Sequence, residues 1–325
     1  MCSNLFFRVF VVMLLAVSAP FTVLAKPSEE KAIVLAVFGT SHPEALPGIL
    51  TIRDQVRQAF PQTRVELAFT SNIIRKIWQK RRLDPRYQEE HPEVPREILE
   101  VKGPLAAMAN LQDEGFGYII VQPTHIVGGE EFADLSAYVD GLNSIHTVKQ
   151  RNMPFNRIII GRPALGTYGT EHAYRQDIEI AAKALGGDVQ RAARQGASLV
   201  YMAHGNEHYS VGYYLELEAV MRSMYPATKT YIGMVEGFPE LSTVMEGLEH
   251  DGVKKVYLKP LMTVAGDHAK NDMAGGEPDS WANTLSAKGI SVQSDMTGVG
   301  EYASFAEIFV QHIREAAQDH GLALR

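Results

Sequence analysis

The residues best suited to chemistry are two histidines in the second half of the chain. His204 follows the apolar run Leu199–Ala203, and His268 comes shortly after the strand-like run Lys255–Lys259. Each histidine lies close to a glycine, and Glu131 occupies the matching place in the first half. Two imidazoles and a carboxylate suit a divalent first-row metal ion and leave coordination positions open for transfer or catalysis. We therefore predict that these three residues handle a metal ion and exchange protons.

A wider set of polar residues also follows the expected strands, where α/β proteins keep their sites. Candidates for substrate binding are Thr40, Ser41, Arg75, Lys76, Asn206 and Glu236. Arg75 and Lys76 belong to a basic stretch that either pairs with ligand carboxylates or forms a solvated helix face. Asp267 is expected to orient His268, as carboxylates behind metal-binding histidines commonly do. His208 is expected to lie beside the site.

Two further motifs point to other chemistry. The segment HGNEH, His204 to His208, fits the H-x-x-E-H pattern of some zinc peptidases. That pattern needs a helix, and Gly205 and Asn206 are poor helix formers, so a zinc hydrolase is the weaker interpretation. The glycine-containing turns GGEE and AGGE lack the G-x-G-x-x-G spacing, so no nucleotide site is predicted.

Apolar runs of strand length alternate with amphipathic segments along the chain, which predicts parallel sheets covered by helices on both faces. We expect strands at Ala32–Phe38, Val65–Phe69, Tyr118–Gln122, Ile158–Gly161, Leu199–Ala203, Thr230–Met234, Lys255–Lys259 and Ile290–Gln293. We expect helices at Leu46–Phe60, Ile73–Lys80, Pro104–Glu114, Tyr213–Met224, Glu240–His250 and Tyr302–Gln318. The polar, proline-containing segment Leu83–Pro95 is expected to be an excursion.

The two halves of the sequence match each other. AIVLAVFGTSH aligns with SLVYMAHGNEH, and VQPTHIVGGEEFAD aligns with LKPLMTVAGDHAKN. The second alignment places Pro123 on Pro260 and Glu131 on His268. We therefore predict an α/β fold of two Rossmann-like domains related by internal duplication, residues 26–160 and 161–325, with an active-site cleft between them. The terminal helix, 302–318, is expected to pack back on the first half.

Composition limits the environment and the partners. The formal charge of −7 makes general nucleic-acid binding a poor expectation. Residues 1–25 have the pattern of a cleavable signal peptide ending at Ala25, so we expect a periplasmic protein with no membrane span after cleavage. The only cysteine, Cys2, lies within that leader. The processed chain would therefore have no disulfide and no thiolate metal site.

Several segments resemble a known family. They are FGTSH, TSNIIRKIWQKR, HIVGGEEF, MAHGNEH, VEGFPE and LMTVAGDHAKNDM, the last followed by DSW. They resemble the anaerobic cobalt chelatases of cobalamin synthesis, the sirohydrochlorin cobaltochelatases, in the class II chelatase superfamily with ferrochelatase. The resemblance implies insertion of Co²⁺ into a sirohydrochlorin-like tetrapyrrole without ATP. It also implies that His204, His268 and Glu131 flank the metal.

The leader departs from that family, whose members are usually cytoplasmic. This leaves open an exported transport protein that binds a metal, haem or another tetrapyrrole on a chelatase scaffold. His125 would then be an extra metal ligand or a haem axial ligand, or else a structural histidine in the cleft. Fe²⁺ accepts the same nitrogen and oxygen ligands as Co²⁺, so the metal also stays open. So do homo-oligomer formation and partners in metal or haem transport.

Overall fold

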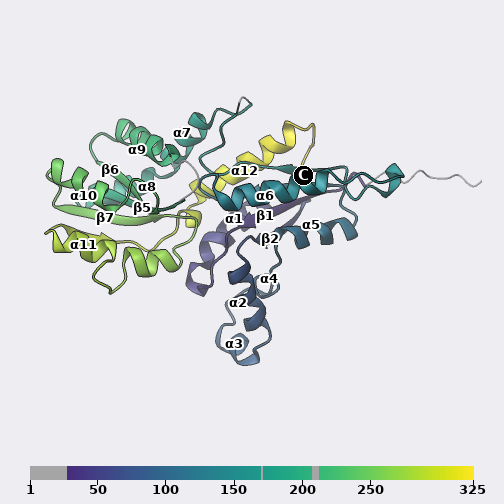
Figure 1. The fold of residues 1–325 in the computed structure, drawn as a ribbon, viewed down its shortest axis with the longest axis horizontal. Helices are drawn as coiled ribbons and strands as arrows, with labels where there is room; N and C mark the ends of the chain where they lie inside the picture. The colour runs from purple at the N-terminus through teal and green to yellow at the C-terminus, as the bar shows by residue number, and fades with distance from the viewer. Residues whose placement is uncertain (1–27, 170, 207–211) are drawn as a thin grey trace, which may run out of the picture.

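The first half of the chain forms a four-stranded parallel sheet in a computed structural model that describes residues 28–169, 171–206 and 212–325 (Figure 1). Its strands are β1 (Lys31–Val37), β2 (Arg64–Phe69), β3 (Tyr118–Pro123) and β4 (Arg157–Ile160). They lie in the order β2-β1-β3-β4. The two central strands are apolar and buried over almost their whole length because helices cover both faces of the sheet.

The second half repeats this sheet. Its strands are β5 (Ser198–Gly205), β6 (Thr230–Glu236), β7 (Lys255–Leu261) and β8 (Ser291–Ser294), in the order β6-β5-β7-β8. Ala36 pairs with Pro123 in the first sheet, and Met202 pairs with Pro260 in the second, so the two prolines occupy the same register position. The predicted α/β fold of two related parallel sheets is confirmed.

Helices connect the strands, including helices at the six ranges that the sequence periodicity indicated. In the first half they are α1 (Leu46–Ala59), α2 (Asn72–Arg82), α3 (Pro85–Glu90), α4 (Arg96–Leu99), α5 (Pro104–Asp113) and α6 (Glu130–Asn143). The helix α6 was not among those expected, although its buried residues Leu135 and Val139 have the four-residue spacing of a helix face. The expected excursion holds α3, and with α2 and α4 it projects from the sheets (Figure 1).

The second half carries the remaining helices of the described chain. They are α7 (Tyr174–Ala184), α8 (Gly186–Arg194), α9 (Gly212–Met224), α10 (Leu241–His250), α11 (Trp281–Ala287) and α12 (Ala303–Gln318). None of the helices in the described ranges is long and apolar enough to cross a membrane. The expected leader, residues 1–25, lies outside the described residues.

One hydrophobic core runs through both halves. Ile33 of β1, Leu199 of β5 and Phe309 of α12 are all buried and belong to the same cluster of contacting side chains. The helix α12 packs against α1, β3 and β4 of the first half and against α7 of the second. In Figure 1 it crosses the middle of the molecule. The terminal helix therefore holds the two sheets in one arrangement, with the carboxyl ends of their strands turned toward a shared pocket.

Candidate active site

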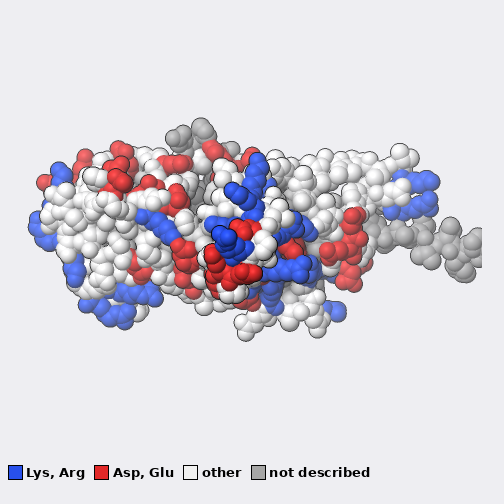
Figure 2. All heavy atoms as spheres, turned by 90° about the horizontal axis from the view of Figure 1, so that it is seen from below, with Lys and Arg blue, Asp and Glu red and all other residues white. Residues whose placement is uncertain are grey.

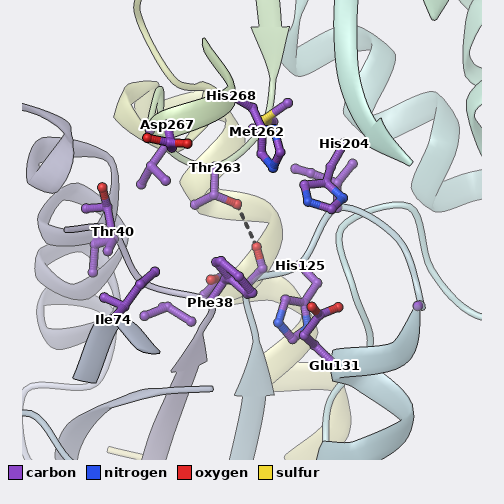
Figure 3. Close-up of a pocket in the computed structure, with 18 of the residues that line it drawn as sticks. Phe38, Thr40, Ile74, His125, Glu131, His204, Met262, Thr263, Asp267 and His268 are labelled. Atoms are coloured by element: carbon purple, nitrogen blue, oxygen red, sulfur yellow. Dashed lines mark hydrogen bonds between the residues drawn. The ribbon is translucent and has the colours of Figure 1, made fainter. Parts of the chain in front are cut away.

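A pocket of about 300 Å³ lies where the carboxyl ends of both sheets meet (Figure 3). The residues that follow or end the four central strands all line it: Phe38 after β1, Thr124 after β3, His204 in β5 and Met262 after β7. The pocket is the cleft between halves that the duplicated sequence predicted. Ligands of open α/β sheets bind in this position because strand-end loops are free to carry polar side chains.

His204 and His268 meet in this pocket. Their ring centroids are 4.8 Å apart and the ring planes are almost perpendicular, at 87°. The strand β5 carries His204 next to Gly205, whose φ of +81° disfavours any side chain. A Cβ at Gly205 would also come within 1.8 Å of the Glu236 carbonyl oxygen. Close packing of the ends of β5 and β6 therefore depends on this glycine and sets the position of His204.

The carboxylate that orients His268 is Asp272. Its Oδ2 lies 2.6 Å from His268 Nδ1, because the π-helical turn Ala269–Met273 brings a residue four positions on beside the ring. The prediction that Asp267 has this role is wrong. Asp267 lies instead 3.7 Å from His42 Nε2. The four-residue spacing of His268 and Asp272 was the sequence signal for the correct partner.

Two carboxylates border the histidines from different sides. Glu131 lines the pocket from the first turn of α6, partly exposed to solvent. Glu236 ends β6, and its Oε2 is 3.9 Å from His204 Nδ1. Within the described ranges, no three His, Cys, Asp or Glu side chains are grouped closely enough to hold a metal ion. The pocket thus brings together the predicted residues His204, His268 and Glu131 without arranging them as a closed metal cage.

The loop after β1 supplies a polar rim anchored by α2. Thr40 and Ser41 both line the pocket. Trp78 Nε1 donates to the Thr40 carbonyl oxygen at 2.7 Å, and the Arg81 guanidinium donates to the Ser41 carbonyl oxygen. The Thr40 hydroxyl accepts a 3.1 Å hydrogen bond from the backbone N–H of His42. The main chain of this loop is therefore held at a fixed position.

His42 belongs to the pocket as well, although it was not among the predicted site residues. Lys270 Nζ lies 3.2 Å from His42 Nδ1 and also forms an ion pair with Glu44. Because Lys270 donates to Nδ1, the His42 N–H faces Asp267. These contacts join the first half to the second at the edge of the pocket. The signal in the sequence was its place directly after FGTS, at the end of the first strand.

Arg75 and Lys76, which were predicted to bind the ligand, do not line the pocket. The face of α2 that lines the pocket is apolar, formed by Ile73, Ile74 and Ile77. Arg75 Nη1 donates to the carbonyl oxygens of Phe69 and Thr70, so the guanidinium is bonded to the backbone at the end of β2. Lys76 is exposed and is not among the pocket residues.

The helix α2 also carries Lys80 and Arg82 on its outer surface. Figure 2 shows Lys and Arg side chains interspersed with Asp and Glu over the projecting part of the molecule. The exposed residues there include Lys80, Arg82, Asp84 and Glu89. This mixture of signs agrees with a solvated helix face rather than with a docking site for a polyanion.

His125 lies in the pocket wall, six residues before Glu131 (Figure 3). Burial lowers the pKa of its imidazole to about 4, so the ring is neutral at pH 7. Both ring nitrogens are closed off from solvent. A haem iron would reach either nitrogen only if the side chains that cover it moved. The expectation of a haem axial ligand is therefore not supported.

The remaining predicted residues lie around His204. Asn206 lines the pocket, and a Cβ at Gly129 of the first half would come within 2.9 Å of its Nδ2. His208 and Glu207 lie outside the described residues. His204 and Gly205 end β5, so His204 is in a strand and the helix that a zinc hydrolase of the H-x-x-E-H type requires does not begin there.

Comparison of the sequence with known proteins points to one protein family. A family model described as cobalt chelatase (CbiK) matches residues 31–318. A sirohydrochlorin cobaltochelatase, CbiKC, of Nitratidesulfovibrio vulgaris is 30% identical over 290 residues, 89% of this chain and 92% of that relative. A sirohydrochlorin cobaltochelatase of Salmonella typhimurium is also 30% identical over 290 residues, 88% of this chain and 96% of that relative.

Solved structures agree on the fold. SirB of Bacillus subtilis with Fe³⁺ superposes with a TM-score of 0.55 at 16% identity, over 90% of this chain and 98% of that one. The sirohydrochlorin chelatase SirB of Bacillus subtilis subspecies spizizenii in complex with cobalt gives 0.53 at 15% identity, over 90% and 97%. At this level of identity the likeness concerns the arrangement of the two sheets.

Proposed function

Since the chain belongs to the cobalt chelatase (CbiK) family, we propose that it inserts Co²⁺ into sirohydrochlorin or a closely related tetrapyrrole. The observation that carries the proposal is the pair His204 and His268, whose ring centroids are 4.8 Å apart in the cleft between the halves. Two neutral imidazoles can bind a divalent ion in transit and accept protons near pH 7. Glu131 borders the same pocket from the other half.

The carboxylate of Asp272 prepares His268 for the metal. When Nδ1–H donates to Asp272, the lone pair of Nε2 is left for a cation. Glu131 carries a negative charge that offsets the charge of the ion and can relay the pyrrole protons that metallation releases. The metal is a substrate here, and open coordination positions allow it to leave for the ring.

The apolar part of the pocket suits a flat macrocycle. Phe38, Ile74 and Phe132 line it from the first half, and Met262 and Val264 from the second. Phe38 and Ile73 are exposed large apolar side chains at the pocket, with 43% and 74% of their surface accessible. Exposed apolar groups beside a polar site are characteristic of ligand surfaces. A tetrapyrrole would cover them on binding.

The proposal is tested by mixing purified protein with metal-free sirohydrochlorin and Co²⁺ or Fe²⁺ and following metallation by absorbance. We expect turnover for the wild type and a loss of at least about 100-fold for His204→Ala and for His268→Ala. His250→Ala, an exposed histidine at the end of α10, is the matched control and keeps full activity. Spectral changes on binding without turnover by the wild type would contradict the proposal and favour a binding protein.

Export is a separate proposal and rests on the apolar leader at residues 1–25. We propose that the chain is cleaved after Ala25 and acts in the periplasm. Fractionation of cells followed by sequencing of the amino terminus tests this. A protein found in the cytoplasm with its leader intact would contradict it, and the metallation assay would be unaffected by that result.

A further inference from the structure

His125 is a polar side chain whose imidazole lacks a partner inside the protein. Its Nδ1 and Nε2 are both inaccessible to solvent, and neither has a hydrogen-bond partner in the part of the chain that the structure describes. A neutral imidazole always carries one N–H donor and one acceptor nitrogen. Leaving both unpaired destabilises the folded chain, so a buried group of this kind needs an explanation.

Packing does not require an imidazole at this position. The register that aligns Pro123 with Pro260 places His125 on Met262, two residues further along in each half. Met262 lines the same pocket from the second half. An apolar side chain therefore fits this place in the fold, so packing does not explain why the first half has a histidine there. Its position in the pocket wall indicates that the histidine contacts a ligand (Figure 3).

The chemistry of the ring limits which ligand group it would meet. Burial keeps the pKa of His125 near 4, so the imidazole remains neutral at neutral pH. A carboxylate on the macrocycle would favour a cationic partner, which burial opposes. A pyrrole N–H is a neutral donor, and a weakly basic imidazole can accept its hydrogen bond without removing the proton. The side chains that cover the nitrogens must move for a pyrrole N–H to reach one of them.

We infer that His125 accepts a hydrogen bond from a pyrrole N–H of the metal-free tetrapyrrole, an inference that rests on the proposed function. Metallation removes the pyrrole protons, so the product cannot make this bond. The acceptor nitrogen of His125 therefore loses this hydrogen bond when the product is formed. The residue would therefore distinguish substrate from product, binding the metal-free ring more tightly and favouring release of the metallated ring.

The test compares both forms of the ring on variants at one position. His125→Leu removes the acceptor, His125→Met copies the side chain of Met262, and His125→Gln keeps a neutral acceptor oxygen. Thermal unfolding is measured first, and we expect the two apolar variants to be at least as stable as the wild type. Each protein is then titrated with metal-free sirohydrochlorin in the presence of a chelator, and separately with cobalt-sirohydrochlorin, by absorbance.

We expect the Kd for metal-free sirohydrochlorin to rise about three- to tenfold in the Leu and Met variants and to stay near the wild-type value in the Gln variant. The Kd for cobalt-sirohydrochlorin should change less than twofold in all three. Equal weakening of both forms would assign His125 to a peripheral group and overturn the inference. So would unchanged binding of the metal-free ring, or weakening of the cobalt form alone, which would indicate ligation of the metal.

Failure of the proposed function gives a different result. If the wild type binds neither form of the ring, the chelatase proposal itself falls and the inference falls with it. If the wild type binds and metallates sirohydrochlorin but the Leu and Met variants bind the metal-free ring as the wild type does, only the assignment of His125 is wrong.

Discussion

The Thr263 hydroxyl donates a 2.7 Å hydrogen bond to the backbone carbonyl oxygen of Thr124, joining the strand-end loops of the two halves inside the pocket (Figure 3). Both residues line the pocket. Thr263→Val keeps the shape of the side chain and removes the donor. We expect the free energy of unfolding to fall by about 1 kcal/mol, measured by urea denaturation. An unchanged denaturation midpoint would show that this bond does not stabilise the junction of the halves.

The two neighbouring aspartates Asp272 and Asp267 provide a matched pair. Asp272→Asn weakens the acceptor at His268 Nδ1, so we expect metal use to fall about 10- to 100-fold. Asp267→Asn leaves the contact between His268 and Asp272 in place, so we expect a smaller loss of metal use. The measurement is the dependence of the metallation rate on Co²⁺ concentration. Equal effects of the two substitutions would show that Asp272 has no special role.

A Cβ added at Gly205 would meet a neighbouring backbone oxygen, whereas a Cβ added at the control position Gly252 would meet no atom. Gly205→Ala places a Cβ within 1.8 Å of the Glu236 carbonyl oxygen at a φ of +81°. Gly252 has a φ of +65° with no atom within 4 Å of such a Cβ, so Gly252→Ala reports backbone strain alone.

We expect a loss of roughly 1 kcal/mol of unfolding free energy for Gly252→Ala, and a clearly larger loss for Gly205→Ala. Only the Gly205 variant should also lose metallation, because the neighbouring His204 moves with the strand end. Equal losses of stability in the two variants, with metallation retained in both, would contradict this account.

The buried imidazole of His125 makes stability depend on pH. Burial lowers the pKa of His125 to about 4 in the folded chain, against about 6.5 in the unfolded chain. Between these values the unfolded chain binds a proton that the folded chain does not, so stability falls as the pH drops from about 6.5 to about 4. The full effect is roughly 3 kcal/mol.

His125→Leu removes the imidazole that binds this proton in the unfolded chain. The unfolding free energy of the variant, measured by denaturation at several pH values, should therefore depend less steeply on pH than that of the wild type over this interval. The carboxylates and the other histidines are the same in both proteins. Their contributions therefore cancel when the two curves of unfolding free energy against pH are subtracted. Parallel curves for the two proteins would show that His125 is not held neutral by burial.

The order of residues along the chain was enough to predict the sheets and the edge at which the site lies. Continuous apolar runs such as Ala32–Phe38 can be buried only as central strands, and their alternation with amphipathic segments leads to parallel sheets. The internal repeat set His268 and Glu131 at matching strand ends. Because the carboxyl ends of parallel strands share one edge, His204 could be assigned to the same cleft without knowledge of any side-chain contact.

Which side chains pair with one another could be seen only once the elements were packed in three dimensions. Asp267 adjoins His268 in the chain, yet Asp272 meets the ring because side chains four positions apart lie on the same side of a helical turn. Arg75 is close in sequence to the residues that line the pocket, but the rotation of α2 turns Ile74 toward it and the guanidinium toward β2. Periodicity reports which face of an element is apolar. The partner of a polar group depends on segments far apart in the chain, which meet only when the halves pack together.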